Sequence, residues 1–250
     1  MSWLITLIDM ITNLKRQEFK YYITDKDVIF LRENLSKFMQ IDRNSNKNNE
    51  YKITTVYFDS LMSNSLNEKL DGINYREKFR IRMYEDDTSS LKFESKQRVD
   101  TVIKKKSYKI NKEEAKQLLN CNYDFLLTKN SSFLKEAYIK FKSKGFSPSV
   151  IVGYDREAYT LPYGEIRITF DKNLRTYNTN TNIFDTKFGS IPIFTNSMQI
   201  LEVKFNSDIP DHIKKILSYT NASRSAISKF VFSKKYSDPY RWRDNINPPK

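Results

Sequence analysis

The chain alternates apolar and polar residues with a period of two over many short stretches, and segments with helical periodicity lie between them. Successive side chains of a strand point to opposite faces, so each alternating stretch predicts a β-strand with one apolar face. The predicted strands are 16–23, 51–59, 76–84, 91–98, 101–108, 150–161, 165–171 and 198–205. The predicted helices are 25–38, 63–70, 111–119, 133–144 and 211–219, with a last element at 226–235. This order, without an internal repeat, predicts an α+β domain.

The polar faces of these strands are unusually rich in charge. In 76–84, one face carries Arg76, Lys78, Arg80 and Arg82, and the other carries apolar residues. The same separation occurs in 16–23, 91–98, 165–171 and 198–205, and Lys104 and Lys106 share a face in 101–108. An open sheet with its charged face in water is one interpretation. We favour a closed antiparallel β tunnel of about eight strands, with a basic lumen and an apolar outer face covered by amphipathic helices. Such a lumen needs a polyanion and a few interior carboxylates as counter-charge.

The overall charge agrees with a polyanionic partner. Lys and Arg outnumber Asp and Glu by 43 to 30 in the 250 residues, giving a formal net charge of +13. Nucleic acid, an anionic membrane surface and a phosphorylated small molecule all fit this balance, and so does a solvated basic surface. Because the aromatic residues of the strands alternate onto the apolar faces, we do not expect single-stranded nucleic acid as a partner.

Several kinds of site are excluded by residue counts. Cys121 is the only cysteine and His212 the only histidine, which rules out an intramolecular disulfide and a Cys–His zinc site. His212 falls at the start of a predicted helix, where we expect a solvated side chain, so catalysis by Ser-His-Asp or Cys-His is not expected. The five glycines form neither a dinucleotide-binding fingerprint nor a P-loop. Phosphate must therefore be bound by side chains.

The two ends of the chain differ from the middle. Residues 1–15 are largely apolar, with Trp3, Leu7 and Ile11 near helical spacing, and predict an amphipathic helix packed on the domain. A helix that docks on a partner or a membrane surface is the alternative. The segment is too short to span a bilayer. The predicted organisation is therefore this helix, a domain over 16–236, and an irregular tail over 237–250. We expect a cytoplasmic protein, with the inner face of the membrane as an alternative location.

A series of short motifs resembles the VTC-type polyphosphate polymerase domain, a branch of the triphosphate tunnel metalloenzyme (CYTH-like) superfamily. The motifs are R-Q-E-F-K-Y at 16–21, Y-F-D at 57–59, K-F-R-I-R-M-Y at 78–84, E-S-K at 94–96, I-K-K-K at 103–106, Y-D-R at 154–156, R-I-T-F-D at 167–171, L-E-V-K at 201–204 and S-K-F at 228–230. They occur in the order found in the family. Arg16 stands where tunnel triphosphatases and related cyclases carry the first Glu of ExExK, which favours the VTC branch.

The resemblance implies a closed antiparallel tunnel, ATP or inorganic polyphosphate as substrate, and Mn2+ or Mg2+ as cofactor. Arginine and lysine can position and neutralise phosphates without a glycine-rich loop. The residues expected to act in catalysis are Lys20, Arg80, Arg82, Lys96, Arg156, Arg167 and Lys229. Phosphate binding is expected of these seven and of Lys104, Lys106, Tyr154, Lys204 and Ser228. Glu202 is the expected metal ligand, since a hard cation prefers carboxylate oxygen, and Glu18 would orient Lys20 or share the metal.

The expected activity is transfer of the terminal phosphate of ATP to a growing polyphosphate chain. One alternative is hydrolysis of tripolyphosphate or a nucleoside triphosphate in the same tunnel. Another is a non-catalytic module that binds polyphosphate. A separate membrane protein is a candidate partner, because the chain lacks the phosphate-sensing domain and the transmembrane helices of the fungal relatives. The sequence leaves the oligomeric state open.

Overall fold

The computed structural model describes residues 17–100, 102–177, 182–184, 189–194, 197–206, 208–220, 222 and 224–237. The predicted N-terminal helix and all of the predicted tail after Ser237 lie outside these residues. The described residues cluster into two compact units. Unit 1 takes its residues from 17–51, 155–173 and 194–227, and unit 2 takes its residues from 52–154, 174–193 and 228–237. No helix in the described part of the chain is long and apolar enough to cross a membrane.

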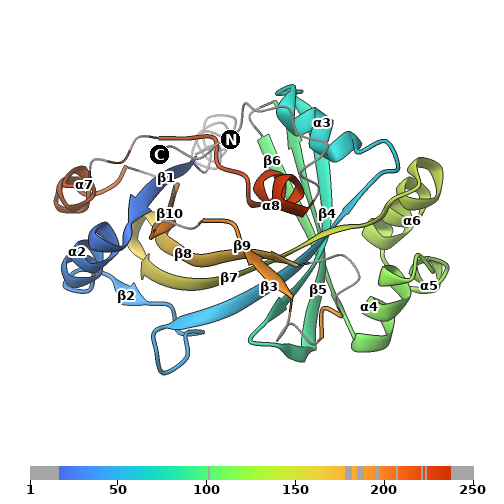
Figure 1. Ribbon diagram of the computed structural model, residues 1–250, viewed down its shortest axis with the longest axis horizontal. Coiled ribbons are helices and arrows are strands. Elements are labelled where there is room, and N and C mark those ends of the chain that lie inside the picture. The colour runs from blue at the N-terminus through green and yellow to red at the C-terminus, as the bar shows by residue number, and fades with distance from the viewer. Residues whose placement is uncertain are drawn as a thin grey trace, which may run out of the picture. The chain divides into compact units, whose positions relative to one another are not determined.

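A large antiparallel sheet runs through the fold (Figure 1). Its strands are β1 (Gln17–Thr24), β2 (Gln40–Ile41), β3 (Glu50–Asp59), β4 (Tyr75–Tyr84), β5 (Asp87–Val99), β6 (Val102–Ile110), β7 (Ser147–Leu161), β8 (Ile166–Tyr177), β9 (Ser190–Pro192) and β10 (Met198–Phe205). The strand order is β1-β10-β8-β7-β3-β4-β5-β6, with β2 paired to β7 and β9 paired to β8. All eight predicted strands are thus confirmed, and the two short strands β2 and β9 were not predicted.

The predicted closure of the sheet is not observed. Over the residues that the structure describes, β1 and β6 are the two ends of the pairing path, and no ladder joins them. The sequence could not decide this point, because alternation along a strand fixes which side chains share a face and carries no information about which edges pair.

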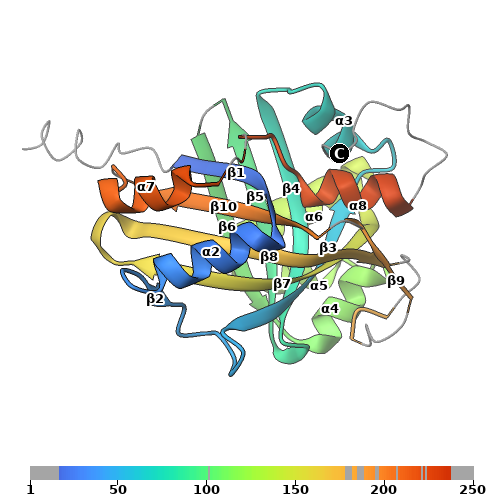
Figure 2. The ribbon, with the colours of Figure 1, turned by 60° about the vertical axis from the view of Figure 1, so that its left-hand side comes forward.

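The helices are α2 (Asp25–Leu35), α3 (Asn64–Leu70), α4 (Lys112–Leu119), α5 (Phe125–Thr128), α6 (Ser132–Lys144), α7 (Asp211–Ser218) and α8 (Lys229–Ser237), with a 3-10 turn at Tyr163–Glu165. In unit 1, α2 and α7 pack on each other and bury the apolar residues of β1, β8 and β10 (Figure 2). A capping box starts α2, in which Thr24 accepts from the Asp27 amide and the Asp27 carboxylate accepts from the Thr24 amide. The helix ends at Leu35, earlier than predicted, so Phe38 leaves the buried face and is 50% exposed.

In unit 2, α4 and α6 cover the apolar face of β4, β5 and β6, as predicted, together with α5, which was not predicted, while α8 lies on the other side of these strands (Figure 1). The covered face is an aromatic cluster centred on Phe141 of α6, whose ring lies 5.0 Å from Phe79 and 5.8 Å from Phe93. On the opposite face, Phe230 of α8 packs 5.2 Å from the Tyr57 ring. Unit 2 therefore buries one face of the meander under three helices and leaves the charged face to α8.

Candidate functional site

Cations are stacked in register on the charged face of unit 2. Residues directly opposite in an antiparallel pair point to the same side, and the register places Arg76 opposite Arg98 and Lys78 opposite Lys96. Arg82 is likewise opposite Lys92. Like charges in such positions repel and destabilise the sheet. We call this set the cation ladder: Arg76, Lys78, Arg80, Arg82, Lys92, Lys96, Arg98, Lys105 and Lys109.

One buried carboxylate balances the centre of the ladder. Glu94 is 1% exposed, and its oxygens lie 2.7 Å from Arg80 Nε, 2.6 Å from Lys105 Nζ and 3.8 Å from Arg82 Nη1. Burial would raise the pKa of Glu94, but Arg80, Arg82 and Lys105 outweigh it and lower this pKa to about 2. Asp59 of β3, which is 2% exposed, shares this face with Tyr57. Two carboxylates cannot neutralise nine cations, so this face keeps a strong positive potential.

Two tyrosines and the start of α8 border the ladder. Burial would raise the pKa of Tyr57, yet the positive charges of Arg80, Arg82 and Lys229 lower it, which shows how positive this environment is. Lys229 Nζ lies 4.9 Å from the centre of the buried Tyr154 ring. The hydroxyl of Ser228 accepts from the Val231 amide at 3.5 Å and so helps to begin α8. The structure thus brings together the predicted residues Arg80, Arg82, Lys96, Tyr154, Ser228 and Lys229 in unit 2.

Lys104 and Lys106 do not join this group. The register pairs Lys105 with Lys96 and Lys106 with Ser95, so Lys105 points to the charged face and its two neighbours point to the other. Lys106 Nζ instead lies 2.6 Å from Glu136 of α6. The expected position of Lys104 and Lys106 beside the other cations was wrong, because three consecutive lysines offer a cation to both faces and the sequence pattern does not distinguish them.

Unit 1 holds a second charged cluster, in which carboxylates and cations alternate. Lys20 is opposite Glu202 and Glu18 is opposite Lys204 in the β1–β10 ladder. Glu202 Oε1 lies 2.9 Å from Lys204 Nζ and 3.9 Å from Lys20 Nζ, and Glu18 Oε1 lies 3.0 Å from Lys20 Nζ. Burial would lower the pKa of Lys20, but Glu202 and Glu18 outweigh it and raise this pKa. Burial dominates at Lys204, and Arg156 adds to it, so the pKa of Lys204 is lowered.

Carboxylates also hold the two predicted arginines of unit 1. Arg156 Nε and Nη2 donate to Asp171 at 2.6 and 2.8 Å, and Arg156 Nη2 lies 3.5 Å from Glu202 Oε2. This bidentate pair fixes the plane of the guanidinium next to Glu202. Arg167 contacts Asp42 at 2.5 Å and donates to the Tyr51 hydroxyl at 2.8 Å.

Four residues of these two units were missed as parts of a site. Asp171 and Glu94 belong to motifs quoted from the sequence, and their alternating positions along the strands already place them on the charged faces. They could therefore have been proposed by name as counter-charges. Asp42 and Tyr51 lie outside the alternating pattern of the charged strands, and no sequence signal links them to Arg167.

The family model of the VTC domain matches residues 15–236 of this chain. This chain belongs to the VTC domain family. The resemblance found in the motifs is thereby confirmed. The comparison with curated proteins found no match.

Solved structures resemble this VTC domain at low sequence identity. The putative adenylyl cyclase HpAC1 from Hippeastrum, described as having a dominant triphosphatase activity, is 15% identical with a TM-score of 0.53, and the match covers 88% of this chain and 95% of that one. A putative adenylate cyclase from Bacillus halodurans is 12% identical with a TM-score of 0.45, covering 82% of this chain and 88% of that one. The first of these similarities supports a common fold.

The carboxylates of this VTC domain supply only some of the ligands that a divalent cation needs. Among the described residues, no group of three or more His, Cys, Asp or Glu side chains could hold a metal by itself. Glu202 and Glu18 nevertheless both approach Lys20 and offer carboxylate oxygens on one face. Mg2+ is commonly bound by one or two carboxylates together with substrate phosphates and water. These residues therefore fit a metal that arrives with a phosphate ligand.

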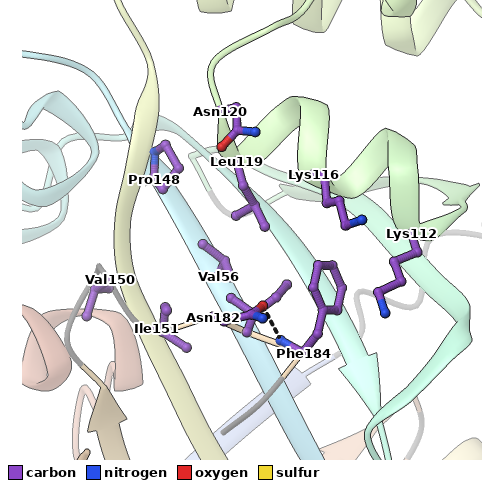
Figure 3. Close-up of a pocket in the computed structure, with 11 residues that line it drawn as sticks. Val56, Lys112, Lys116, Leu119, Asn120, Pro148, Val150, Ile151, Asn182 and Phe184 are labelled. Atoms are coloured by element: carbon purple, nitrogen blue, oxygen red, sulfur yellow. Dashed lines mark hydrogen bonds between the residues drawn. The ribbon is translucent and has the colours of Figure 1, made fainter.

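A pocket of about 460 Å³ in unit 2 has a different character (Figure 3). Its walls are mostly apolar, with Val56, Ile151 and Phe184 among them, while Lys112 and Lys116 of α4 stand on one side. Lys112 Nζ lies 5.2 Å from the centre of the Phe184 ring. Because Val56 belongs to the apolar face of β3, this pocket is separate from the cation ladder, and it lacks the density of cations that a phosphate chain requires.

Proposed function

We propose that this VTC domain is a metal-dependent polyphosphate polymerase, which transfers the terminal phosphate of ATP to the end of a growing chain and releases ADP. The proposed binding surface is the basic face of the strands, as the family resemblance implies. The family match supports an activity on polyphosphate or triphosphate. Use of ATP as the donor agrees with the expected cytoplasmic location.

The cation ladder is the observation that carries this proposal. Arg76 and Arg82 are six residues apart on β4, so the ladder extends over roughly 20 Å at about 3.4 Å per residue. A triphosphate has only two bridging oxygens and needs far fewer cations. An extended polyanion would neutralise the ladder along its length, which supports a chain of phosphates as the bound substrate.

The proposed chemistry exchanges one phosphoanhydride bond for another. A terminal oxygen of the chain attacks the γ-phosphorus of ATP, the bond between the β,γ-bridging oxygen and the γ-phosphorus breaks, and ADP leaves. Phosphate oxygens are already ionised near neutral pH, since a phosphate monoester has a second pKa of about 6. The attacking group therefore needs no general base. What it needs is alignment and neutralisation, which arginine and lysine supply.

Individual residues have distinct proposed roles. Arg80, Arg82, Lys96 and Lys229 bind and align phosphates in unit 2, with Lys105 in the place first expected for Lys104 and Lys106. In unit 1, Lys20, Lys204, Arg156 and Arg167 neutralise phosphate charge. Tyr154 and Ser228 are proposed to donate hydrogen bonds to phosphate oxygens. Glu202, with Glu18 beside it, would hold Mn2+ or Mg2+, which when bound neutralises charge on the phosphate oxygens.

Hydrolysis of a triphosphate is the second candidate, because the Hippeastrum protein of the same fold is described as a triphosphatase. A hydrolase usually needs a base that takes a proton from water. Glu94, Glu202 and Asp171 are all ion-paired, and a carboxylate held by cations is a weak base. This observation favours the polymerase.

The products that the protein forms from ATP distinguish a polymerase from a hydrolase. The protein is incubated with ATP and Mn2+, with and without a short polyphosphate primer, and the products are separated by chain length on a gel. The polymerase predicts ADP together with long acid-labile chains that an exopolyphosphatase degrades. ADP with stoichiometric orthophosphate and no polymer would replace the polymerase by the hydrolase. Polyphosphate binding without any product would leave a non-catalytic module.

A further inference from the structure

An apolar row lies exposed at one end of the meander in unit 2. The register pairs Tyr75 with Val99 and Val99 with Val102, so these three side chains form a continuous line across β4, β5 and β6. They are 49%, 37% and 45% exposed. Ile73 precedes the row and is 46% exposed, and Ile103, which is opposite Arg98, is 47% exposed on the reverse face of the same strand end. We call these five residues the apolar end.

The helices of unit 2 stop short of this row. On the same face, the next row inward holds Glu77 opposite Gln97, and Lys140 of α6 binds Glu77 at 2.5 Å. Only the row beyond it, with Phe79, is covered by the Phe141 ring. Single exposed apolar residues are ordinary on a protein surface, whereas a paired row of three, with further exposed apolar residues at the same strand end, indicates a binding surface.

Cations surround the apolar end. Lys104 is exposed on the face of the row, since the register pairs it with Gln97, whereas Arg98 and Arg76 flank the row from the reverse, charged face. The Arg98 Nε donates to the carbonyl of Asp100 in the β5–β6 turn at 2.6 Å, which keeps the guanidinium beside the turn. Asp100 is an acidic residue of this turn, and the cations Arg76, Arg98 and Lys104 outnumber it.

We propose that the apolar end binds an anionic lipid bilayer, with Tyr75, Val99 and Val102 among the headgroups and Arg98 and Lys104 at the lipid phosphates. Short apolar side chains flanked by cations suit the boundary between headgroups and acyl chains, where tyrosine is enriched. Each cation near such a surface adds to the attraction. A protein partner usually requires about 800 Å² per side, which is more than the end of three strands offers.

The test is sedimentation of the full chain with lipid vesicles, of phosphatidylcholine alone or mixed with phosphatidylserine. Wild-type protein is expected to sediment with the mixed vesicles and much less with phosphatidylcholine alone. The triple variant Tyr75→Ser, Val99→Ser, Val102→Ser should bind the mixed vesicles at least about tenfold more weakly, since each tenfold step corresponds to 1.4 kcal/mol. Lys104→Glu should weaken binding and reduce its dependence on salt.

Matched controls distinguish binding by this surface from nonspecific binding through other exposed apolar residues. Leu127 and Ile139 are exposed apolar residues of the same unit, at 46% and 64%, so the double variant Leu127→Ser, Ile139→Ser should bind like wild type. An unchanged far-ultraviolet spectrum and an unchanged thermal shift with tripolyphosphate would show that the triple variant is folded. Equal binding of wild type and triple variant would overturn the proposal, as would wild-type protein that binds neither vesicle. In the latter case, loss of an acidic protein partner from the triple variant would assign the apolar end to a protein.

Discussion

At the scale of single residues, the two charged clusters differ in the ratio of carboxylates to cations. In unit 1, Glu18, Glu202 and Asp171 alternate with the cations, and contacts of 2.6–3.9 Å join them. In unit 2, the nine cations of the ladder outnumber Glu94 of β5 and Asp59 of β3, the carboxylates that these strands place on the same face. A metal with its phosphate ligand fits the first cluster, and a bare polyanion fits the second. The two kinds of cluster therefore predict different consequences for loss of a carboxylate.

Replacing Glu202 should separate chemistry from binding. Glu202→Gln keeps the shape of the side chain and removes the charge that a divalent cation needs, so turnover of ATP with Mn2+ should fall by about a hundredfold or more. The thermal shift with tripolyphosphate should persist, because the cations of both units remain. Glu33→Gln, on the exposed side of α2, is the control and should leave turnover unchanged. Full turnover in Glu202→Gln would remove Glu202 from the metal site.

Replacing Glu94 should instead lower stability. The pKa of Glu94 falls from an ordinary 4.5 to about 2, so its contribution to folding is present above pH 4.5 and is lost as the pH falls towards 2. A shift of this size corresponds to about 3 kcal/mol at neutral pH, at 1.36 kcal/mol per pKa unit. Urea unfolding of Glu94→Gln should show this loss at pH 7 and a weaker pH dependence between pH 4.5 and 2. A variant as stable as wild type at pH 7 would contradict the role of Glu94 as counter-charge.

At the scale of elements, the sequence predicted most strands and helices because their period is clear. The short elements β2 and α5 were missed, since two to four residues cannot show a period. The faces of β4 and β5 were predicted correctly, because charged and apolar residues alternate strictly there. The face of β6 was not, because Lys104, Lys105 and Lys106 present the same residue type to both sides. The position of α8 on a charged face depends on tertiary packing of Phe230, which local pattern does not report.

The register of β6 provides a matched test of the ladder. Lys105→Ala removes a cation from the charged face, whereas Lys106→Ala removes one from the opposite face of the same strand. Charge-assisted hydrogen bonds contribute about 1.5–3 kcal/mol, so Lys105→Ala should weaken polyphosphate binding by about tenfold or more. Lys96→Ala should behave like Lys105→Ala, and Lys106→Ala like wild type. Isothermal titration with a defined polyphosphate measures the four affinities. Equal losses at Lys105 and Lys106 would mean that general charge, and not the ladder, binds the chain.

At the scale of the whole molecule, the VTC family and the large sheet were both predictable, whereas closure of the sheet was not. Families are recognised from short motifs whose order is preserved. Closure depends on which edges meet, and edge pairing is set by twist, bulges and covering segments, which are distributed over the chain.

Polyphosphate length should control the stability of the domain. A ligand that binds only the folded state raises the melting temperature, and longer chains neutralise more of the ladder. The melting temperature should therefore rise from orthophosphate to tripolyphosphate to longer chains, and level off once the chain exceeds the ladder. The rise should be smaller at high salt. Scanning fluorimetry at equal concentrations of phosphate units provides the measurement, and equal shifts for all lengths would contradict an extended site.

Repulsion within the cation ladder has a consequence for the life of the protein in a cell. An empty ladder keeps like charges face to face, so the domain opens more often and is exposed to proteases during those openings. If the domain makes polyphosphate, its own product supplies the missing counter-charge and extends its lifetime. Enzyme abundance and product abundance would then reinforce each other. An exopolyphosphatase would act against this reinforcement in two ways. It would consume the polymer, and it would thereby shorten the lifetime of the enzyme that makes it.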